Sequence, residues 1–352
     1  MNTKIVKVDP RDPGKVEIKW AVDSLKDGGL VIIPTETVYG IAADSSNPKA
    51  MERLAGIKER PQDKPFSLHV SDKGKVEVYA KNIPISAYKL IDKFWPGPLT
   101  IVLEAKDGGT IGLRMPDNKI ALAVIMLANV PVVLPSANLA GKPAPVNFEE
   151  AIADLKGKVD FAIDTGKTRI GIESSVVDLT AGEPQVLREG AIKKEEIERT
   201  AKTKNVLFVC TGNSCRSVMA EALLKKKLKE LNRNDVEVSS AGVMVIGGLG
   251  ATEYTKEVLK KEGMDVSSHV SRRITAEMVK KTDLILAMEH LQEERILEAV
   301  PSAKNRVFLL KEFARIDNNT LDVADPIGKS EEFYFQTFDV IKEAIERIAV
   351  LI

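Results

Sequence analysis

The chain has 352 residues, 44% hydrophobic and 29% charged, and its 51 basic residues equal its 51 acidic ones. The length predicts two domains, each able to bury a core, and the zero net charge argues against binding nucleic acid through bulk charge. The apolar stretches are too short to span a bilayer, which argues against a membrane protein. The chain has only two cysteines, close together, and three scattered histidines, which argues against a disulfide scaffold and a zinc site. We therefore expect a cytoplasmic protein.

Short strands and helices mix irregularly in the first half of the chain. Strands are expected over residues 30–34, 66–70, 99–103, 130–134, 161–163 and 175–179. Helices are expected over residues 85–94, 149–155 and 47–58, the last with Asn47 as its cap and Pro48 at its first position. Because strands and helices do not alternate regularly, this half predicts an α+β fold with a mixed sheet.

Two segments of this half carry residues suited to phosphate. Lys58 and Arg60 end an expected helix, and Ser136 and Asn138 follow an expected strand. The basic pair could clamp a triphosphate, or it could only complement the helix dipole. The polar pair could bind a ligand, or it could only form a turn. The spacing alone leaves both alternatives open.

A domain boundary is expected where composition changes near residue 200. The charged segment IKKEEIERTAKTK is expected to be helical before it becomes a linker. It precedes VLFVC, an apolar run typical of a buried parallel strand. We therefore expect domains over residues 1–197 and 204–352, joined by a linker over residues 198–203.

Strands and helices alternate in the second half. Strands are expected over residues 206–210, 236–240, 283–287 and 306–309, and helices over residues 217–231, 252–262, 289–299 and 331–351. This order predicts a four-stranded parallel, doubly wound α/β sheet, with a ligand site at the carboxyl ends of its strands.

The segment VCTGNSCRS lies between the first of these strands and its helix. Its backbone N–H groups and the helix N-terminus can converge on a tetrahedral oxyanion, and Arg216 can hold two oxygens of that anion. The same field favours a thiolate at Cys210, a nucleophile for phosphorus. A buried structural cysteine beside a capping loop is the alternative. The expected phosphate-loop residues are Thr211, Gly212, Asn213, Ser214 and Cys215.

Three further residues fit this chemistry. Asp325, in an Asp-Pro turn, could protonate the leaving group as general acid. Ser217 could hydrogen-bond the thiolate, and Asn213 could fix the loop through backbone bonds. Cys215 could form a reversible disulfide with the nucleophile, or it could only pack in the loop.

Five segments of the second half resemble low-molecular-weight protein tyrosine phosphatases, over about residues 204–352. They are CTGNSCRS, SSAGV, SSHVSRRIT, DLILAM and ADPIG. The resemblance implies a flavodoxin-like fold and a cysteinyl-phosphate intermediate, with Cys210, Arg216 and Asp325 in the roles above. Ser214, a small hydroxyl residue, and Ile327, which is not aromatic, are closer to the protein-arginine-phosphatase branch. Phosphoarginine is therefore the favoured substrate and phosphotyrosine the alternative.

Seven segments of the first half, in order, resemble the YrdC-type threonylcarbamoyl-AMP synthase domain. They are PTETVYGIAAD, KERPQDKPFSLHV, WPGPLT, GLRMP, PSANLAGKPAP, ESSVVDL and LREG. The resemblance implies that L-threonine, bicarbonate and ATP give threonylcarbamoyl-AMP and pyrophosphate for tRNA modification. It implies an ATP site made of Lys58, Arg60, Ser136, Asn138 and Arg188. It implies a threonine site made of Thr35, Tyr39, His69, Arg114, Ser174 and Ser175. His69 could act there as a general base, or it could only be structural.

We therefore predict a bifunctional enzyme that uses ATP as a substrate, with Mg²⁺ entering alongside it. No permanently bound cofactor, protein metal site or membrane partner is expected. The implied partners are a tRNA-modification transferase complex, a phosphoprotein, and tRNA or double-stranded RNA. The alternative is a non-catalytic RNA- or nucleotide-binding first domain attached to an active protein tyrosine phosphatase.

Overall fold

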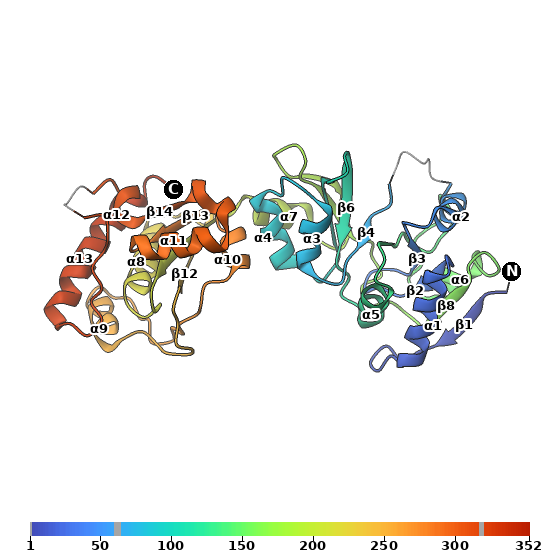
Figure 1. Ribbon diagram of the computed structural model, residues 1–352, viewed down its shortest axis with the longest axis horizontal. Helices are drawn as coiled ribbons and strands as arrows, with labels where there is room; N and C mark the ends of the chain where they lie inside the picture. Colours follow the sequence, from blue (N-terminus) through green and yellow to red (C-terminus); the bar gives the residue numbers. More distant parts are fainter. Residues whose placement is uncertain (1, 60–64, 317–319) are drawn as a thin grey trace. The chain divides into compact units, whose positions relative to one another are not determined.

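The computed structural model describes residues 2–59, 65–316 and 320–352, and the chain divides into two compact units, residues 1–201 and 202–352 (Figure 1). The expected linker is wrong in one respect, because residues 198–202 belong to helix α7 (Lys194–Lys202). Ile197 and Ala201 of this helix are buried in the core of the N-terminal unit, so its apolar face is used in packing. Only Thr203 separates α7 from the first strand of the second unit.

The N-terminal unit is built on a mixed ten-stranded sheet, counted over the described residues, with the order β1-β8-β2-β3-β7-β4-β6-β5-β9-β10. Its parallel and antiparallel pairings confirm the mixed sheet expected from the sequence. The strands are β1 (Lys4–Lys7), β2 (Val31–Ile33), β3 (Gly40–Asp44), β4 (Leu68–His69), β5 (Leu99–Glu104), β6 (Thr110–Arg114), β7 (Val132–Val133), β8 (Phe161–Asp164), β9 (Ser175–Asp178) and β10 (Gln185–Arg188).

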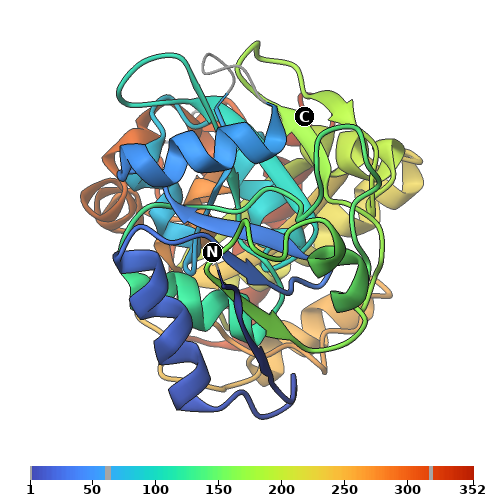
Figure 2. The ribbon, with the colours of Figure 1, turned by 90° about the vertical axis from the view of Figure 1, so that its right-hand side faces the viewer.

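Helices cover this sheet and bury a core on each face. They are α1 (Lys15–Lys26), α2 (Pro48–Lys58), α3 (Val76–Tyr79), α4 (Ile85–Phe94), α5 (Lys119–Ala128), α6 (Phe148–Ala153) and α7, with a 3-10 turn over Lys73–Lys75. Successive side chains of a strand face opposite ways, so Val31 and Ile33 join the core under α1 and α5, whereas Ile32 joins the other. Figure 2 shows α1 and α5 beside each other at the sheet.

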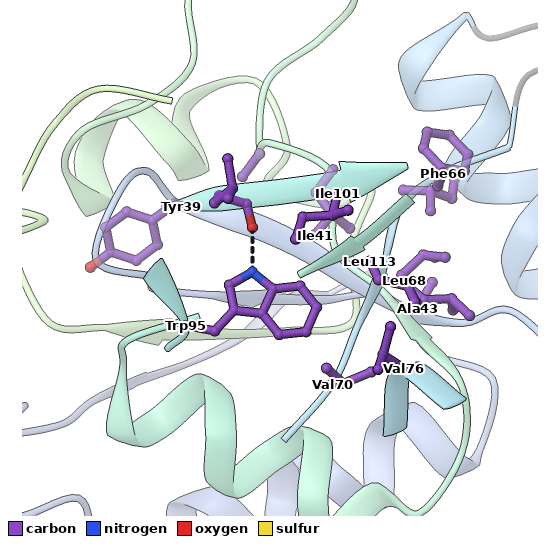
Figure 3. Close-up of a cluster of buried hydrophobic side chains, with 14 of the residues drawn as sticks. Tyr39, Ile41, Ala43, Phe66, Leu68, Val70, Val76, Trp95, Ile101 and Leu113 are labelled. Atoms are coloured by element: carbon purple, nitrogen blue, oxygen red, sulfur yellow. Dashed lines mark hydrogen bonds between the residues drawn. The ribbon is translucent and has the colours of Figure 1, made fainter. Parts of the chain in front are cut away.

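The second core surrounds the strands that carry the candidate site. Tyr39, Ile41 and Leu113 are buried there beside Trp95 (Figure 3). The Trp95 indole Nε1 donates to the backbone oxygen of Leu99 at 2.8 Å, so this large side chain is buried without losing its hydrogen bond. Strands β3, β5 and β6 therefore pack against this core through Ile41, Ile101 and Leu113.

The C-terminal unit contains the expected all-parallel four-stranded sheet, with the order β12-β11-β13-β14. Its strands are β11 (Lys204–Cys210), β12 (Val236–Gly242), β13 (Leu284–Ala287) and β14 (Val307–Leu309). Its helices are α8 (Arg216–Glu230), α9 (Glu253–Lys261), α10 (Ala276–Lys280), α11 (His290–Ala299), α12 (Leu310–Phe313) and α13 (Glu331–Ile348), with a 3-10 turn over Pro301–Arg306. Phe208 packs with α8 and α13 on one face, and Leu207 packs towards α10 and α11 on the other.

The expected elements of both units are present, with shifted ends. Helix α4 has the expected bounds, and the expected strands over residues 66–70 and 130–134 shorten to the two-residue strands β4 and β7. Strands β1, β3, β6 and β10 and helices α1 and α5 were not predicted. The four strands complete the sheet of the N-terminal unit, and the two helices pack on one face of it.

Candidate active sites

A cavity of about 510 Å³ lies in the N-terminal unit, over one face of its sheet. Residues from the loop after β2, from the end of α2 and from strands β4, β6 and β10 line it. The structure brings eight of the predicted site residues to its wall: Thr35, Tyr39, Lys58, His69, Arg114, Ser136, Ser174 and Arg188. Segments spread over more than 150 residues of sequence therefore meet at one opening.

Two of the predicted ATP residues, Ser136 and Asn138, contact the Lys58 ammonium group. Its Nζ donates to the backbone oxygens of Ser136 and Asn138 at 3.0 and 2.8 Å, and to Asn138 Oδ1 at 3.0 Å. Asn138 is outside the cavity lining, and its amide Nδ2 fixes the turn by donating to Lys142 O at 2.7 Å. Asn47 caps α2 as predicted. Arg60 lies outside the described residues.

Arg114 forms a buried ion pair that the sequence did not predict. Its Nη2 donates to Glu36 Oε1 at 2.7 Å and to Thr37 Oγ1 at 2.8 Å, and Nε donates to Gly97 O at 3.3 Å. Arg114 is 5% exposed and Glu36 is 2% exposed. Because both charges are buried, each needs the other to offset its cost of desolvation. Glu36 therefore fixes the guanidinium of Arg114 at the cavity wall.

His69 faces the same cavity from β4, beside Arg114 in the sheet register. Burial, and the nearby charge of Arg114, lower the pKa of His69 to about 3. Its Nδ1 lies 3.3 Å from Ser67 O, so Nδ1 carries the proton there, while Nε2 is buried without a partner among the described residues. At neutral pH the ring therefore offers one unused acceptor.

This shift predicts how acid affects the N-terminal unit. In the unfolded chain His69 takes up a proton as the pH falls below its ordinary pKa of 6.5, whereas in the folded chain it stays neutral until about pH 3. The contribution of His69 to the free energy of unfolding is therefore fully present above pH 6.5 and is lost as the pH decreases towards 3. We expect His69 to contribute a loss of about 2 kcal/mol between pH 7.5 and 5. Fluorescence-detected urea unfolding measures it, because both tryptophans, Trp20 and Trp95, lie in this unit.

The variant His69→Asn isolates this contribution. It should show a pH dependence of the unfolding free energy that is shallower by that amount. An unchanged pH dependence in the variant would show that His69 titrates normally in the fold.

Of the remaining predicted residues, Arg188 and Ser174 line the cavity, whereas Ser175 does not. Arg188 donates from Nη2 to Ser174 Oγ at 3.1 Å and from Nη1 to Glu173 Oε1 at 2.8 Å, at the cavity rim. The Ser175 hydroxyl is buried and bonds the backbone of Ile192, donating to O at 2.7 Å and accepting from N at 2.9 Å.

Thr35 and Tyr39 shape the loop between β2 and β3. The Thr35 hydroxyl donates to Val38 O at 2.6 Å, which closes a tight turn. The Tyr39 hydroxyl donates to Gly166 O at 2.9 Å and accepts from Thr165 N at 3.0 Å. Burial raises the pKa of Tyr39, so the phenol stays neutral and supports the loop.

The loop after β11 forms a cradle around Cys210. The Cys210 sulfur lies 3.0 Å from Ser217 Oγ and 3.2 Å from the Asn213 backbone N–H, which donates to it. Both groups can donate to a thiolate, which is the form that attacks phosphorus. The loop leads directly into α8, whose first residues add the positive end of the helix dipole.

Asn213 fixes the shape of this cradle. It adopts a left-handed backbone conformation, with φ of 53°, and its Nδ2 donates to Ser217 Oγ at 3.0 Å and Ser240 Oγ at 2.8 Å. The loop passes so close to β12 that a Cβ on Gly242 would lie 2.6 Å from Thr211 O. Only glycine permits this approach at that position.

Arg216 is 1% exposed and lies between three acceptors. Nη1 donates to Val323 O at 2.7 Å and lies 3.1 Å from Glu289 Oε2, while Nη2 is paired with Asp325 Oδ2. The expected nucleophile, arginine and acid therefore meet in one site. Glu289 is an addition that no sequence motif indicated.

The other loop residues contact the walls of the cradle. The Gln292 amide Nε2 donates to Thr211 Oγ1 at 3.2 Å, and Gln292 is fully buried. Both cysteines are free. The Cys215 sulfur lies 3.5 Å from the hydroxyl of Tyr334, whose pKa burial raises to about 12. Neither Gln292 nor Tyr334 was predicted, since their roles depend on contacts between distant elements.

Comparisons with known proteins agree with both sites. The Sua5/YciO/YrdC family model, described as telomere recombination, matches residues 23–190, and the low molecular weight phosphotyrosine protein phosphatase model matches residues 205–351. The chain is 43% identical over 311 residues to a threonylcarbamoyl-AMP synthase of Pyrococcus abyssi, covering 77% of this chain and 92% of that protein. It is 39% identical over 144 residues to a protein-arginine-phosphatase of Geobacillus stearothermophilus, covering 41% of this chain and 93% of that protein.

One solved structure extends this similarity to the fold. The crystal structure of P. abyssi Sua5 complexed with L-threonine aligns with a TM-score of 0.54 and 27% identity, over 87% of this chain and 99% of that one.

Fold and sites together define a chain that carries two enzyme domains. It belongs to the threonylcarbamoyl-AMP synthase family through its N-terminal unit and to the low-molecular-weight phosphotyrosine protein phosphatase family through its C-terminal unit. Both are enzyme families, and the resemblance drawn from the sequence is confirmed for each. Within the described residues, no helix is long and apolar enough to cross a membrane.

Proposed function

We propose that this chain is a bifunctional cytoplasmic enzyme. Its N-terminal unit would make threonylcarbamoyl-AMP from L-threonine, bicarbonate and ATP, and its C-terminal unit would dephosphorylate phosphoarginine in proteins. The observation that supports the first activity most is the single cavity where Lys58, His69 and Arg114 meet. The observation that supports the second is the cradle around Cys210, with Arg216 and Asp325 at its edge.

In the N-terminal unit, the proposed roles follow from charge and exposure. Lys58 and Arg188, together with Arg60, would neutralise the triphosphate, while Ser136 and Asn138 position the nucleotide. Arg114 would pair with the threonine carboxylate, and His69 Nε2 would accept a hydrogen bond from an N–H or O–H of threonine. Thr35, Tyr39 and Ser174 would shape this pocket. Positioning supplies most of the catalysis.

Mg²⁺ would enter with ATP and be held mainly by phosphate oxygens. Among the described residues no group of three or more His, Cys, Asp or Glu side chains is arranged to hold a metal ion, and Mg²⁺ commonly relies on substrate phosphates. The proposed partners are the transferase complex that uses the product, and tRNA.

Pyrophosphate release tests the first activity. The purified chain should release pyrophosphate from ATP only when both threonine and bicarbonate are present. A non-catalytic nucleotide-binding module would bind ATP without threonine-dependent release, and that result would contradict the proposal.

In the C-terminal unit, the proposed chemistry uses two steps. The Cys210 thiolate attacks phosphorus while Arg216 and the loop N–H groups hold the phosphoryl oxygens. The bond from phosphorus to the leaving group breaks as Asp325 donates a proton. Water then hydrolyses the cysteinyl-phosphate, and Ser217 stabilises the departing thiolate.

The preference for phosphoarginine rests on Ser214, within the loop after Cys210, and on Ile327, whose backbone N–H donates to Asp325 Oδ1. It is tested by phosphate release from matched phosphoarginine and phosphotyrosine peptides, with Cys210→Ser as the blank. We expect a higher kcat/KM for phosphoarginine, and faster hydrolysis of phosphotyrosine would overturn the preference while leaving the phosphatase activity in place.

A further inference from the structure

Asp325 lies in an irregular segment that other parts of the C-terminal unit must hold in place. Of the described residues, 320–329 form this acid segment, which contains neither helix nor strand. A general acid has to lie within hydrogen-bond reach of the leaving group, so the position of the segment matters for catalysis. Two of its contacts run through Arg216, whose Nη1 donates to Val323 O at 2.7 Å and whose Nη2 pairs with Asp325 Oδ2.

These two contacts are the ones that a substrate disturbs. When a phosphoryl group enters the cradle, the guanidinium of Arg216 has to turn N–H groups towards the phosphoryl oxygens. Asp325 must also be protonated before it can donate, and a neutral carboxyl holds a guanidinium less strongly than a carboxylate does. Contacts that do not involve Arg216 must therefore keep Asp325 near the leaving group.

Asp322, three residues before Asp325, fastens the acid segment to the start of α11. Its Oδ1 accepts from the His290 backbone N–H at 3.0 Å and lies 2.8 Å from His290 Nδ1. An ionised carboxylate only accepts hydrogen bonds, so Nδ1 donates to it. His290 is the first residue of α11, where backbone N–H groups lack partners within the helix and the helix dipole favours a negative charge.

Two further bonds hold the backbone of the acid segment at the same place. Nζ of Lys311 donates to Asp322 O at 3.1 Å. The backbone N–H of Val323 donates to Met288 O at 2.8 Å. Lys311 is 3% exposed, whereas the Asp322 side chain is 42% exposed. Asp322 is therefore the anchor that a substitution can remove without opening the core.

We propose that Asp322 is a positioning residue for the general acid. It keeps the acid segment docked on α11 while Arg216 binds the phosphoryl oxygens. The proton of Asp325 then stays directed at the leaving-group atom as the bond from that atom to phosphorus breaks, and Asp322 transfers no proton itself. This proposal rests on the phosphatase chemistry proposed above, and it holds for phosphoarginine and for phosphotyrosine.

The test compares two aryl phosphates that differ in their need for a proton. Phenoxide is a strong base and needs a proton to leave, whereas dinitrophenoxide is a weak base and leaves without one. In the full chain, Asp322→Ala should lower kcat/KM for phenyl phosphate about tenfold or more, since a small misplacement can cost about 10²-fold. The kcat/KM for dinitrophenyl phosphate should change less than about threefold. Asp322→Asn keeps the acceptor oxygen, so it should stay within about threefold of the wild-type chain on both.

Two controls separate positioning from damage to the fold. Asp265→Ala removes an exposed carboxylate that also accepts from a backbone N–H, that of Ser267 at 2.9 Å, and it should change neither rate. When Asp325→Asn is already present, adding Asp322→Ala should lower kcat/KM for phenyl phosphate less than about twofold, because the two residues act as a unit. Equal losses on both aryl phosphates, or a full further loss in the double variant, would overturn the proposal.

The single variant Asp325→Asn shows which premise fails. It should lower kcat/KM for phenyl phosphate about 10²-fold or more, the contribution of a general acid. If it does not, Asp325 is not the general acid, and this inference fails with that assignment. If it does, and Asp322→Ala leaves the ratio of the two kcat/KM values unchanged, only the inference is wrong.

Discussion

Replacing Cys210 by serine is expected to abolish phosphatase activity and to leave threonine-dependent pyrophosphate release unchanged. A serine hydroxyl is far less acidic than a thiol, so the donors from Ser217 and Asn213 cannot make it an effective nucleophile. We expect phosphate release to fall at least about 10³-fold, as when other enzymes lose their nucleophile. Pyrophosphate release should stay within about twofold, because the two predicted residue sets lie in separate compact units.

Binding of inorganic phosphate is the control for the Cys210→Ser variant. The cradle N–H groups and Arg216 remain, so phosphate should still bind when measured by calorimetry. Retained phosphate release in this variant would contradict the role of Cys210. Loss of pyrophosphate release together with phosphatase activity, in a folded variant, would show that the sites are coupled.

Replacing Arg114 by glutamine should both destabilise the N-terminal unit and remove its threonine dependence. The variant leaves the Glu36 carboxylate buried at 2% exposure without its cationic partner. Breaking a buried ion pair in this way costs about 3–5 kcal/mol. Urea unfolding followed by tryptophan fluorescence measures this loss, and pyrophosphate release measures the activity.

The double variant Glu36→Gln, Arg114→Gln separates these two effects. Removing both charges should restore most of the unfolding free energy, because no uncompensated charge stays buried. Threonine-dependent pyrophosphate release should remain lost, since nothing pairs with the threonine carboxylate. A stable double variant with a normal KM for threonine would contradict the role proposed for Arg114.

Much of the C-terminal unit could be predicted because its sequence signals are local. The apolar run before Cys210 and the amphipathic stretch after Arg216 predict β11 and α8, and the short loop between them fixes the cradle. Asp325 was found because an Asp-Pro turn stands out in sequence. Glu289 could not be found in this way, because its contact with Arg216 joins α11 to α8 across the sheet.

The N-terminal unit was predicted less completely, because several of its helices and strands lack a clear periodic pattern in the sequence. Helix α5, KIALAVIMLA, is apolar on nearly every side and so lacks the alternation that reveals a surface helix. Strands β4 and β7 were expected from the sequence, but each has only two residues, too few for a periodic pattern to define its ends.

The candidate sites show the same limit for single residues. The family resemblance led to His69 and Arg114 as site residues, but the buried partner Glu36 comes from a loop 78 residues away from Arg114. Ser175 was placed in the pocket, yet its hydroxyl ties β9 to the backbone at Ile192. Which side chains reach the cavity depends on tertiary packing that spacing in the sequence does not encode.

The most direct test of the account measures both activities in one preparation of the full chain, beside Cys210→Ser and the double variant Glu36→Gln, Arg114→Gln. We expect the wild-type chain to release pyrophosphate in a threonine- and bicarbonate-dependent reaction and phosphate from a phosphoarginine peptide. Each variant should lose only its own activity. A wild-type chain without one of the two activities, or variants that lose both while folded, would contradict the claim that two independent catalytic sites work on this chain.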